Sequence, residues 1–248
     1  ATIPSLAIHL DREANSNRSI NPQRDILPVV LHLDAQEGET TGAKLDFRDL
    51  LAAQVKEQYP EYDDIRVLDF EVSLYDTQKP ARIGMDGSFI ASARLDNLLS
   101  CFTGLQALID ADDQHWSVLV CNDHEEVGSA SAVGAQGPML VDFMAAISVS
   151  DAANRQLRER SLMVSVDNAH AVHPNFSDKH DDNHGPLLNG GPVIKINRNQ
   201  RYATSGEGSA LIRLLAERCD VPVQTFVVRT DLGCGSTIGP ITATETGI

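Results

Sequence analysis

The stretch Leu119-Val-Cys-Asn-Asp-His-Glu-Glu-Val-Gly128 decides how this chain is organised. An apolar run over 116–121 predicts a buried strand, and that strand ends where polar residues begin. Glu125 and Glu126 follow before the next glycine. Neighbouring side chains on an irregular segment point in different directions, so one carboxylate can bind a metal while the other acts as a general base. Taken alone, such a pair is more often a solvated turn, because charged residues are mostly exposed.

The composition limits the kinds of function that this chain can have. Its 248 residues allow one large domain or two ordinary ones. The formal net charge of −15 argues against nucleic acid and anionic membranes as partners, since both call for basic patches. No apolar run approaches the ~18 residues of a transmembrane helix, and no signal peptide is visible. Four cysteines without a C-x-x-C pair favour a reduced, cytoplasmic protein.

Residues 1–82 have the pattern of a small, β-rich region. Strands are predicted over 26–33 and 65–74, and a helix is predicted over 47–59, where the proline at position 60 ends it. The polar segment 34–42 predicts a loop. The chain opens on alanine rather than methionine, and we expect both of its ends to be cut from a longer protein.

Residues 83–248 alternate strands with helices, which predicts an α/β domain with a mostly parallel sheet. The strongest helical signal runs from Leu95 to Ile109, where apolar residues recur at i, i+3, i+4 and i+7. Two further helices are predicted, over 138–147 and 211–216. The predicted strands cover 89–93, 116–121, 162–166, 193–196 and 225–229.

Side chains that bind metals follow several of these predicted strands. Asp96 lies at the start of the helix predicted from Leu95 to Ile109, where an acidic residue also has an ordinary role as a helix cap. Asp167, His170 and His173 follow the strand over 162–166, and no apolar periodicity makes them part of a core. We expect these residues to converge with the Glu125-Glu126 pair at one edge of the sheet. Crowded carboxylates repel one another, so at least one of them should have a raised pKa.

Other motifs carry weaker signals. The triplets His9-Leu-Asp11 and His32-Leu-Asp34 each place two metal-binding types on one face of a strand, but both are short enough to arise by chance. Lys195 interrupts an apolar strand and is either an exposed edge-strand lysine or a cation that faces an anionic substrate group. The glycine-rich segment 230–239 lacks the P-loop lysine and the G-x-G-x-x-G spacing, so we do not assign it to nucleotide binding.

Taken together, these motifs resemble the aspartyl aminopeptidases, a family of di-zinc metallopeptidases, over essentially the whole chain. The resemblance implies a three-layer αβα peptidase domain over 83–248 and part of a β-rich dimerisation domain over 1–82. It also implies an enzyme that removes amino-terminal Asp or Glu from short peptides, and a homo-oligomer. The matching stretches are Ile3–Leu10, Ala93–Leu98, Asp123–Ser129, Asp167–Asn175 with Asp178-Lys-His180, Gly191–Lys195 with Gln200-Arg-Tyr202, and Gly233–Pro240.

The resemblance further implies the roles of single residues. Asp96 would bridge two zinc ions, while Glu126 would bind one of them and Asp167 the other. Glu125 would be the general base that takes a proton from the attacking water. His9 would reach into the site of a neighbouring subunit. The implied substrate-binding residues are His9, His170, His184, Lys195 and Tyr202.

Two other functions stay open from the sequence. A related di-zinc amidohydrolase, such as a carboxypeptidase or a deacylase, would need a similar set of carboxylates. A non-catalytic assembly or peptide-binding subunit would keep the fold without the metals. The family segments that supply two further metal-binding histidines have no counterpart in these 248 residues. We therefore expect the 248 residues alone to be inactive or nearly so.

Overall fold

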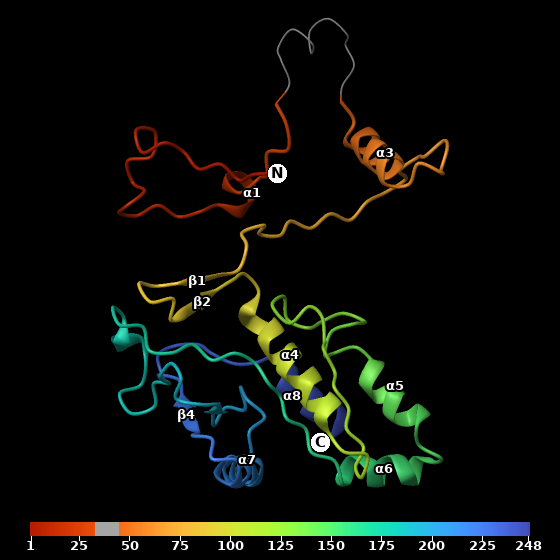
Figure 1. Cartoon of the computed structure of the whole chain (residues 1–248), viewed down its shortest axis with the longest axis vertical. Helices are drawn as coiled ribbons and strands as arrows, with labels where there is room; N and C mark the ends of the chain where they lie inside the picture. Colours follow the sequence, from red (N-terminus) through yellow and green to blue (C-terminus); the bar gives the residue numbers. More distant parts are fainter. Residues whose placement is uncertain (33–44) are drawn as a thin grey trace, which may run out of the picture. The chain divides into compact units, whose positions relative to one another are not determined.

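The computed structural model describes residues 1–32 and 45–248, which divide into two units, Ala1–Gln78 and Lys79–Ile248 (Figure 1). The predicted loop over 34–42, and with it Asp34 of the second His-x-Asp triplet, lies outside the described residues. No helix among the described residues has the length and hydropathy that crossing a bilayer requires.

The described part of the first unit contains the helices α1 (Pro22–Asp25) and α3 (Phe47–Gln58). The start of α3 is fixed by Asp46, whose carboxylate accepts a hydrogen bond from the Arg48 amide. Its end precedes the proline at position 60, which cannot continue a helix. The helix predicted from the spacing of apolar residues is therefore confirmed.

The two strands predicted in this first unit do not form as strands in the described residues. Only Val29 pairs, through an isolated antiparallel bridge with Thr2. The stretch 65–74 has an extended, unpaired backbone, and most of its apolar side chains are exposed. An apolar run becomes a strand only when a neighbour satisfies its backbone hydrogen bonds, and among the described residues of these runs the bridge between Thr2 and Val29 is the only such pairing.

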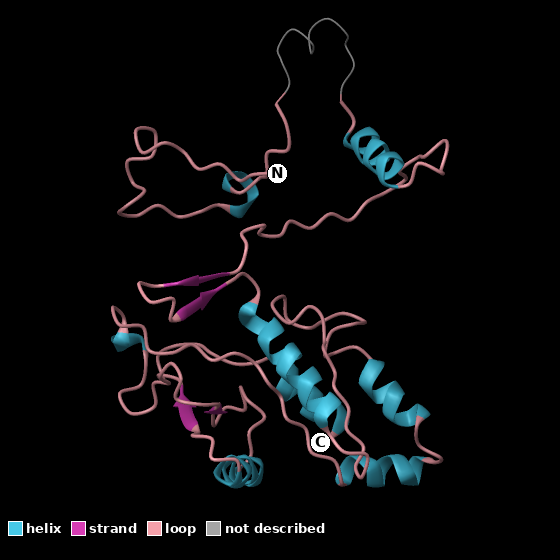
Figure 2. Ribbon diagram, viewed as in Figure 1, coloured by secondary structure: helices cyan, strands magenta, loops and turns pink. Residues whose placement is uncertain are grey.

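The second unit mixes helices with two small sheets, shown in magenta in Figure 2. In one sheet β1 and β2 pair antiparallel; in the other β3 and β4 pair parallel, with Lys195 opposite Phe226. Helix α7 lies between β3 and β4 in the chain, so the parallel pair is a β-α-β unit and the α/β class is confirmed. The elements in order are β1 (Ala81–Ile83), β2 (Phe89–Ala91), α4 (Leu95–Asp110), α5 (Met139–Ala146), α6 (Asp151–Glu159), η1 (Ser177–Lys179), β3 (Val193–Ile196), α7 (Gly206–Arg218), β4 (Gln224–Val227) and α8 (Ile238–Thr246).

The apolar runs over 116–121 and 162–166 were predicted as buried strands, and this prediction is wrong for the described residues. Both runs are extended but unpaired. Trp116 is 76% exposed, and Leu162 and Val164 are also exposed. No described strand pairs with either run, and the run over 116–121 instead lies beside residues of α5, with which it lines a second cavity.

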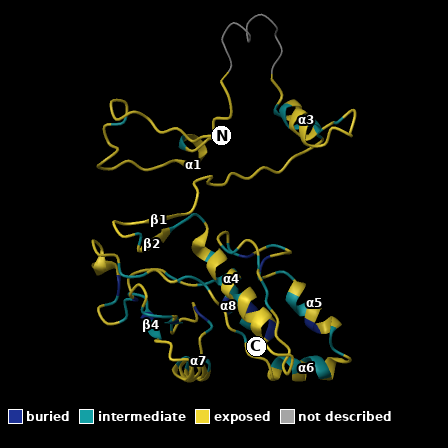
Figure 3. Ribbon diagram, viewed as in Figure 1, coloured by how far each residue is buried: buried dark blue, intermediate teal, exposed yellow. Residues whose placement is uncertain are grey.

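Three helices predicted from periodicity, now α4, α5 and α7, are confirmed, but α4 differs in two respects. Its first turn is irregular, since Asp96 and Asn97 have non-helical backbone angles and Arg94 takes the N-cap position. Asp96 is therefore not the capping residue. The apolar row of α4 is also exposed, as Figure 3 shows in yellow along most of the helix.

The buried apolar core of the described residues is small, and most of it belongs to the parallel sheet and its surroundings. Its members come from α5, β3, β4 and the segment that follows β3. They are Met144, Ile194, Tyr202 and Phe226.

Candidate active site

The Glu125-Glu126 pair lies on a tightly closed turn. The Gly128 amide donates to the Glu125 carbonyl oxygen at 3.0 Å, and the Ser129 amide donates to the His124 carbonyl oxygen at 2.7 Å. A Cβ added at Gly134 would lie 2.3 Å from the Ser129 carbonyl oxygen, so only glycine permits this close approach. The two carboxylates have different partners: the charge of Glu126 raises the pKa of Asp96, and Glu125 is hydrogen-bonded to Thr237 at the start of α8.

Two asparagine side chains join the start of α4 to the segment that follows the 162–166 run. Asn97 Nδ2 donates to the Val166 carbonyl oxygen at 2.9 Å, and Asn168 Nδ2 donates to the Leu95 carbonyl oxygen at 3.0 Å. This reciprocal pair lies at the irregular first turn of α4. The pair brings Asp96 beside Asp167, although 70 residues separate them in the sequence.

The Asp96 carboxyl has a raised pKa, as expected for crowded carboxylates. Burial raises it most, followed by the charge and hydrogen bond of Asp167 and then by the charge of Glu126. Lys195 acts in the opposite sense and lowers the pKa of Asp96. The cluster thus holds three carboxylates and one ammonium group, which leaves an excess of negative charge.

Lys195 faces this carboxylate cluster rather than water. Its side chain is only 15% exposed. Its ammonium nitrogen lies 3.0 Å from Asp167 Oδ2 and 2.7 Å from the Asn168 carbonyl oxygen, and 5.8 Å from the centre of the Tyr202 ring. Burial raises the pKa of Tyr202, as does the hydrogen bond between its hydroxyl and Cys234 Sγ. The interpretation of Lys195 as a solvent-facing edge lysine does not hold.

His170 lies among other aromatic rings on the far side of this cluster. Its ring centre is 5.4 Å from that of His180 and 5.5 Å from that of Phe226. Burial lowers the pKa of His170, and the neighbouring His180 and Lys195 lower it further. His180 is 8% exposed, and neither of its ring nitrogens has a hydrogen-bond partner among the described residues. The burial of His170 and its neighbours His180 and Lys195 all favour its neutral imidazole over the charged form.

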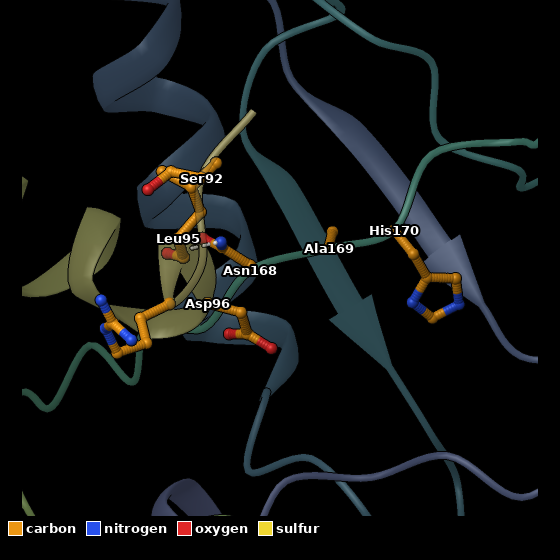
Figure 4. Close-up of a pocket in the computed structure, with 7 residues that line it drawn as sticks. Ser92, Leu95, Asp96, Asn168, Ala169 and His170 are labelled. Atoms are coloured by element: carbon orange, nitrogen blue, oxygen red, sulfur yellow. Dashed lines mark hydrogen bonds between the residues drawn. The ribbon is translucent and has the colours of Figure 1, made fainter. Parts of the chain in front are cut away.

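A cavity of about 440 Å³ opens at this place, which is large enough for one residue of a peptide. Figure 4 shows Asp96 on one side of the view and His170 on the other, with Asn168 and Ala169 on the segment between them. The residues that line it come from the start of α4 and from the segment after Asp167. They are Ser92, Arg94, Leu95, Asp96, Asn168, Ala169 and His170.

Three residues that the sequence assigned to the site make no described contact with this cluster. The Glu125 carboxylate contacts Thr237 instead, at 3.1 Å from the hydroxyl. His184 is paired with Asp181, whose pKa it lowers through a hydrogen bond. His9 lies in the first unit, so its relation to the site stays a prediction.

Comparison with known proteins shows the family to which the chain belongs. The sequence model described as aminopeptidase I zinc metalloprotease (M18) matches residues 1–248. The chain belongs to the M18 family. It is 55% identical over its whole length to a probable M18 family aminopeptidase 2 of Pseudomonas putida, 56% of which it covers. The chain thus spans about half the length of the curated relatives it matches.

Solved structures of M18 aminopeptidases share the fold. In the cryo-EM structure of the Ape4 and Nbr1 complex, the similar chain is 36% identical with a TM-score of 0.82, over 99% of this chain and 50% of the other. The crystal structure of yeast aminopeptidase 1 gives 28% identity and a TM-score of 0.65, over 80% of this chain and 47% of the other. The resemblance found in the sequence is confirmed at the level of the M18 family.

Zinc is the metal of the M18 family, and the described residues fit it in donor type and charge. Asp96, Glu126 and Asp167 offer carboxylate oxygens, and their mutual repulsion is what a divalent cation would relieve. Among the residues described, however, no three His, Cys, Asp or Glu side chains lie close enough together to hold one ion. That these residues bind zinc therefore stays a prediction.

Several residues with clear contacts at the site lie within the matching stretches, but no role was assigned to them from the sequence. His180 stood inside a matching motif but had no role, and its contact with His170 depends on the fold of the loop between them. Ser129 and Thr237 are 108 residues apart and meet only in the folded chain. Asn97 and Asn168 are ordinary polar residues until their hydrogen bonds are known.

Proposed function

We propose that the full-length protein is a zinc aminopeptidase that removes amino-terminal Asp or Glu from short peptides. The observation that supports this proposal is the raised pKa of Asp96, a cavity-lining residue, under the influence of Asp167 and Glu126 in a chain of the M18 family. These three carboxylates would hold the metal. A bound zinc would polarise the scissile carbonyl and make a coordinated water more acidic.

The residues of this chain would bind, orient and transfer protons around that centre. Glu125 would accept a proton from the attacking water at its carboxylate and deliver it to the leaving amine. Neutral His170 would donate a hydrogen bond to the oxygen on which negative charge develops, and its lowered pKa suits a neutral donor.

Selection of an acidic residue is assigned to Lys195, with Tyr202 beside it. The Lys195 side chain is largely removed from water, where a charge interaction is stronger than at a surface. His184 and His9 would complete the substrate site, His9 from a neighbouring subunit. The first unit would then serve in dimerisation, and one similar solved structure is a dodecamer of yeast Ape1. We also expect a reducing, cytoplasmic setting, since all four cysteines are free.

The test uses the zinc-loaded full-length protein and three peptides of one sequence: Asp-Ala-Phe, its amino-acetylated form and Leu-Ala-Phe. The proposal predicts release of free aspartate from the first peptide, none from the acetylated one, and much slower release of leucine. Release of phenylalanine would instead indicate a carboxypeptidase, and loss of the acetyl group a deacylase. No hydrolysis of any of the three would favour the non-catalytic subunit.

A further inference from the structure

Thr237 stands at the start of helix α8, but its hydroxyl does not cap that helix. It occupies the N-cap position and makes no side-chain hydrogen bond to the first turn. A threonine at this position ordinarily accepts a hydrogen bond from a backbone amide of the first turn. Here Oγ1 lies 3.1 Å from Oε1 of Glu125, and the Thr237 amide nitrogen lies 3.5 Å from the same oxygen. Both donors of one residue therefore converge on one carboxylate oxygen.

A second hydroxyl supports the first. Ser129 is fully buried, at 0% exposed, and its Oγ lies 2.8 Å from Oγ1 of Thr237. An ionised carboxylate can only accept, so the Thr237 hydroxyl donates to Glu125. The proton between the two hydroxyls is then that of Ser129, which donates to Thr237. Hydrogen bonds in such a chain polarise and strengthen one another.

The backbone at Ser129 indicates that its hydroxyl is needed there. Its φ of 63° lies in the left-handed region, which glycine adopts at little cost and other residues adopt only where their surroundings fix them. Its amide donates to the His124 carbonyl oxygen, and its own carbonyl oxygen accepts from the Gln136 amide. Glycine would suit this conformation better, but glycine could not donate to Thr237.

We propose that Thr237, supported by Ser129, is the positioning residue that holds the Glu125 carboxylate for proton transfer. The inference rests on the proposed role of Glu125 as general base, and it names the groups that orient that base. Glu125 lies on a turn, and no other side chain among the described residues is hydrogen-bonded to its carboxylate. A general base must lie within hydrogen-bond reach of its proton, so the loss of this support lowers the rate of the chemical step.

The test compares Thr237→Val, which removes the hydroxyl at nearly constant shape, with Thr237→Ser, which keeps it, both in the full-length zinc enzyme. Thr237→Val should lower kcat by ~10–100-fold, because a small misplacement of a catalytic group costs that much. KM, zinc content and the affinity for the product aspartate should stay within ~twofold, since none of them depends on proton transfer. Thr237→Ser should retain most of the wild-type kcat, and Ser129→Ala should lower kcat less than Thr237→Val does.

Thr244→Val is the matched control, because Thr244 lies on the same helix and its hydroxyl donates to a backbone carbonyl, that of Pro240, at 2.8 Å. Its kcat should equal that of the wild type. The proposal is overturned if Thr237→Val keeps its kcat, if Thr237→Ser loses as much as Thr237→Val, or if Thr237→Val loses zinc along with activity.

Glu125→Gln, measured in parallel, separates this proposal from the general-base assignment. If Glu125→Gln is inactive while Thr237→Val is fully active, only the positioning role fails. If Glu125→Gln remains active, the assignment of the base fails and the positioning proposal with it.

Discussion

The ammonium nitrogen of Lys195 lies 3.0 Å from Oδ2 of Asp167, with 15% of the lysine side chain exposed. Lys195 also lowers the pKa of Asp96, and Asp96 lines the cavity together with Arg94. A substrate carboxylate approaching a chain with a net charge of −15 is repelled at long range, so its binding must come from a local positive charge. Lys195 is the described lysine that occupies such a place.

Lys195→Met in the full-length enzyme should lower kcat/KM on aspartyl peptides and change it little for asparaginyl peptides. A charge-assisted hydrogen bond in a poorly solvated pocket is worth about 1.5–3 kcal/mol, which corresponds to a preference of ~10–100-fold. The measurement is the ratio of kcat/KM for Asp over Asn peptides in the wild type and the variant.

The control for this substitution is Lys179→Met. The Lys179 side chain is 62% exposed, and the nearest carboxylate oxygen, that of Asp178, lies 3.6 Å away. The ratio of kcat/KM for Asp over Asn peptides in Lys179→Met should match that of the wild type. If Lys195→Met also leaves the ratio unchanged, acid recognition belongs to another residue.

Removal of the Asp96 charge should stabilise the metal-free protein in a pH-dependent way. The pKa of Asp96 is raised in the folded chain, so the folded state holds this proton more tightly than the unfolded state does. The contribution of protonated Asp96 to the free energy of unfolding is therefore fully present below the ordinary carboxyl pKa of about 3.9. It is lost as the pH rises through the raised pKa of the folded state. Asp96→Asn should raise the Tm of the chelator-treated protein at pH 7, with a gain that shrinks toward pH 4.

Asp113→Asn serves as the comparison, because it removes one negative charge from an exposed loop residue. It should leave the Tm nearly unchanged at every pH. An Asp96→Asn protein that is less stable than the wild type at pH 7 without metal would contradict the claim that burial and the neighbouring carboxylates disfavour the charged form of Asp96.

The sequence predicts those parts of the molecule that local signals determine. The helices α3, α4, α5 and α7 follow from apolar spacing and from Pro60, and the proximity of Asp96 to Asp167 follows from motifs at the ends of apolar runs. Burial could not be predicted in this way. The runs containing Trp116 and Val164 are apolar enough for buried strands, yet whether they pair or are covered depends on neighbours that sequence spacing does not reveal.

The orientation of the side chains at the site could not be predicted from the sequence either. Asp96 was expected to be either a helix cap or a metal ligand, and nothing in the sequence indicated the irregular first turn of α4 or the hydrogen bonds of Asn97 and Asn168 there. The partner of Glu125 could not be found either, because Thr237 comes from a glycine-rich segment with no motif pointing to Glu125. Contacts of this kind connect distant residues through one hydrogen bond each and leave no periodic pattern.

The 248 residues alone should hold zinc poorly. Zinc in catalytic sites usually has at least one imidazole or thiolate ligand, whereas the described cluster offers mainly carboxylate oxygens. Zinc analysis after gel filtration should give well below one ion per chain for this segment and a stoichiometric content for the full-length protein. Tight zinc binding by the segment would mean that a histidine such as His9, His32 or His124 supplies the missing nitrogen.

The most direct measurement of the central claim is zinc content together with turnover in two full-length variants, Glu125→Gln and Glu126→Gln. The two side chains are neighbours in the sequence, but Glu125 contacts Thr237 while Glu126 acts on Asp96. The account predicts that Glu125→Gln keeps its zinc and loses turnover by ~100-fold or more, because an amide cannot accept the proton. It predicts that Glu126→Gln loses zinc. Equal loss of zinc in both variants, or full turnover in Glu125→Gln, would contradict it.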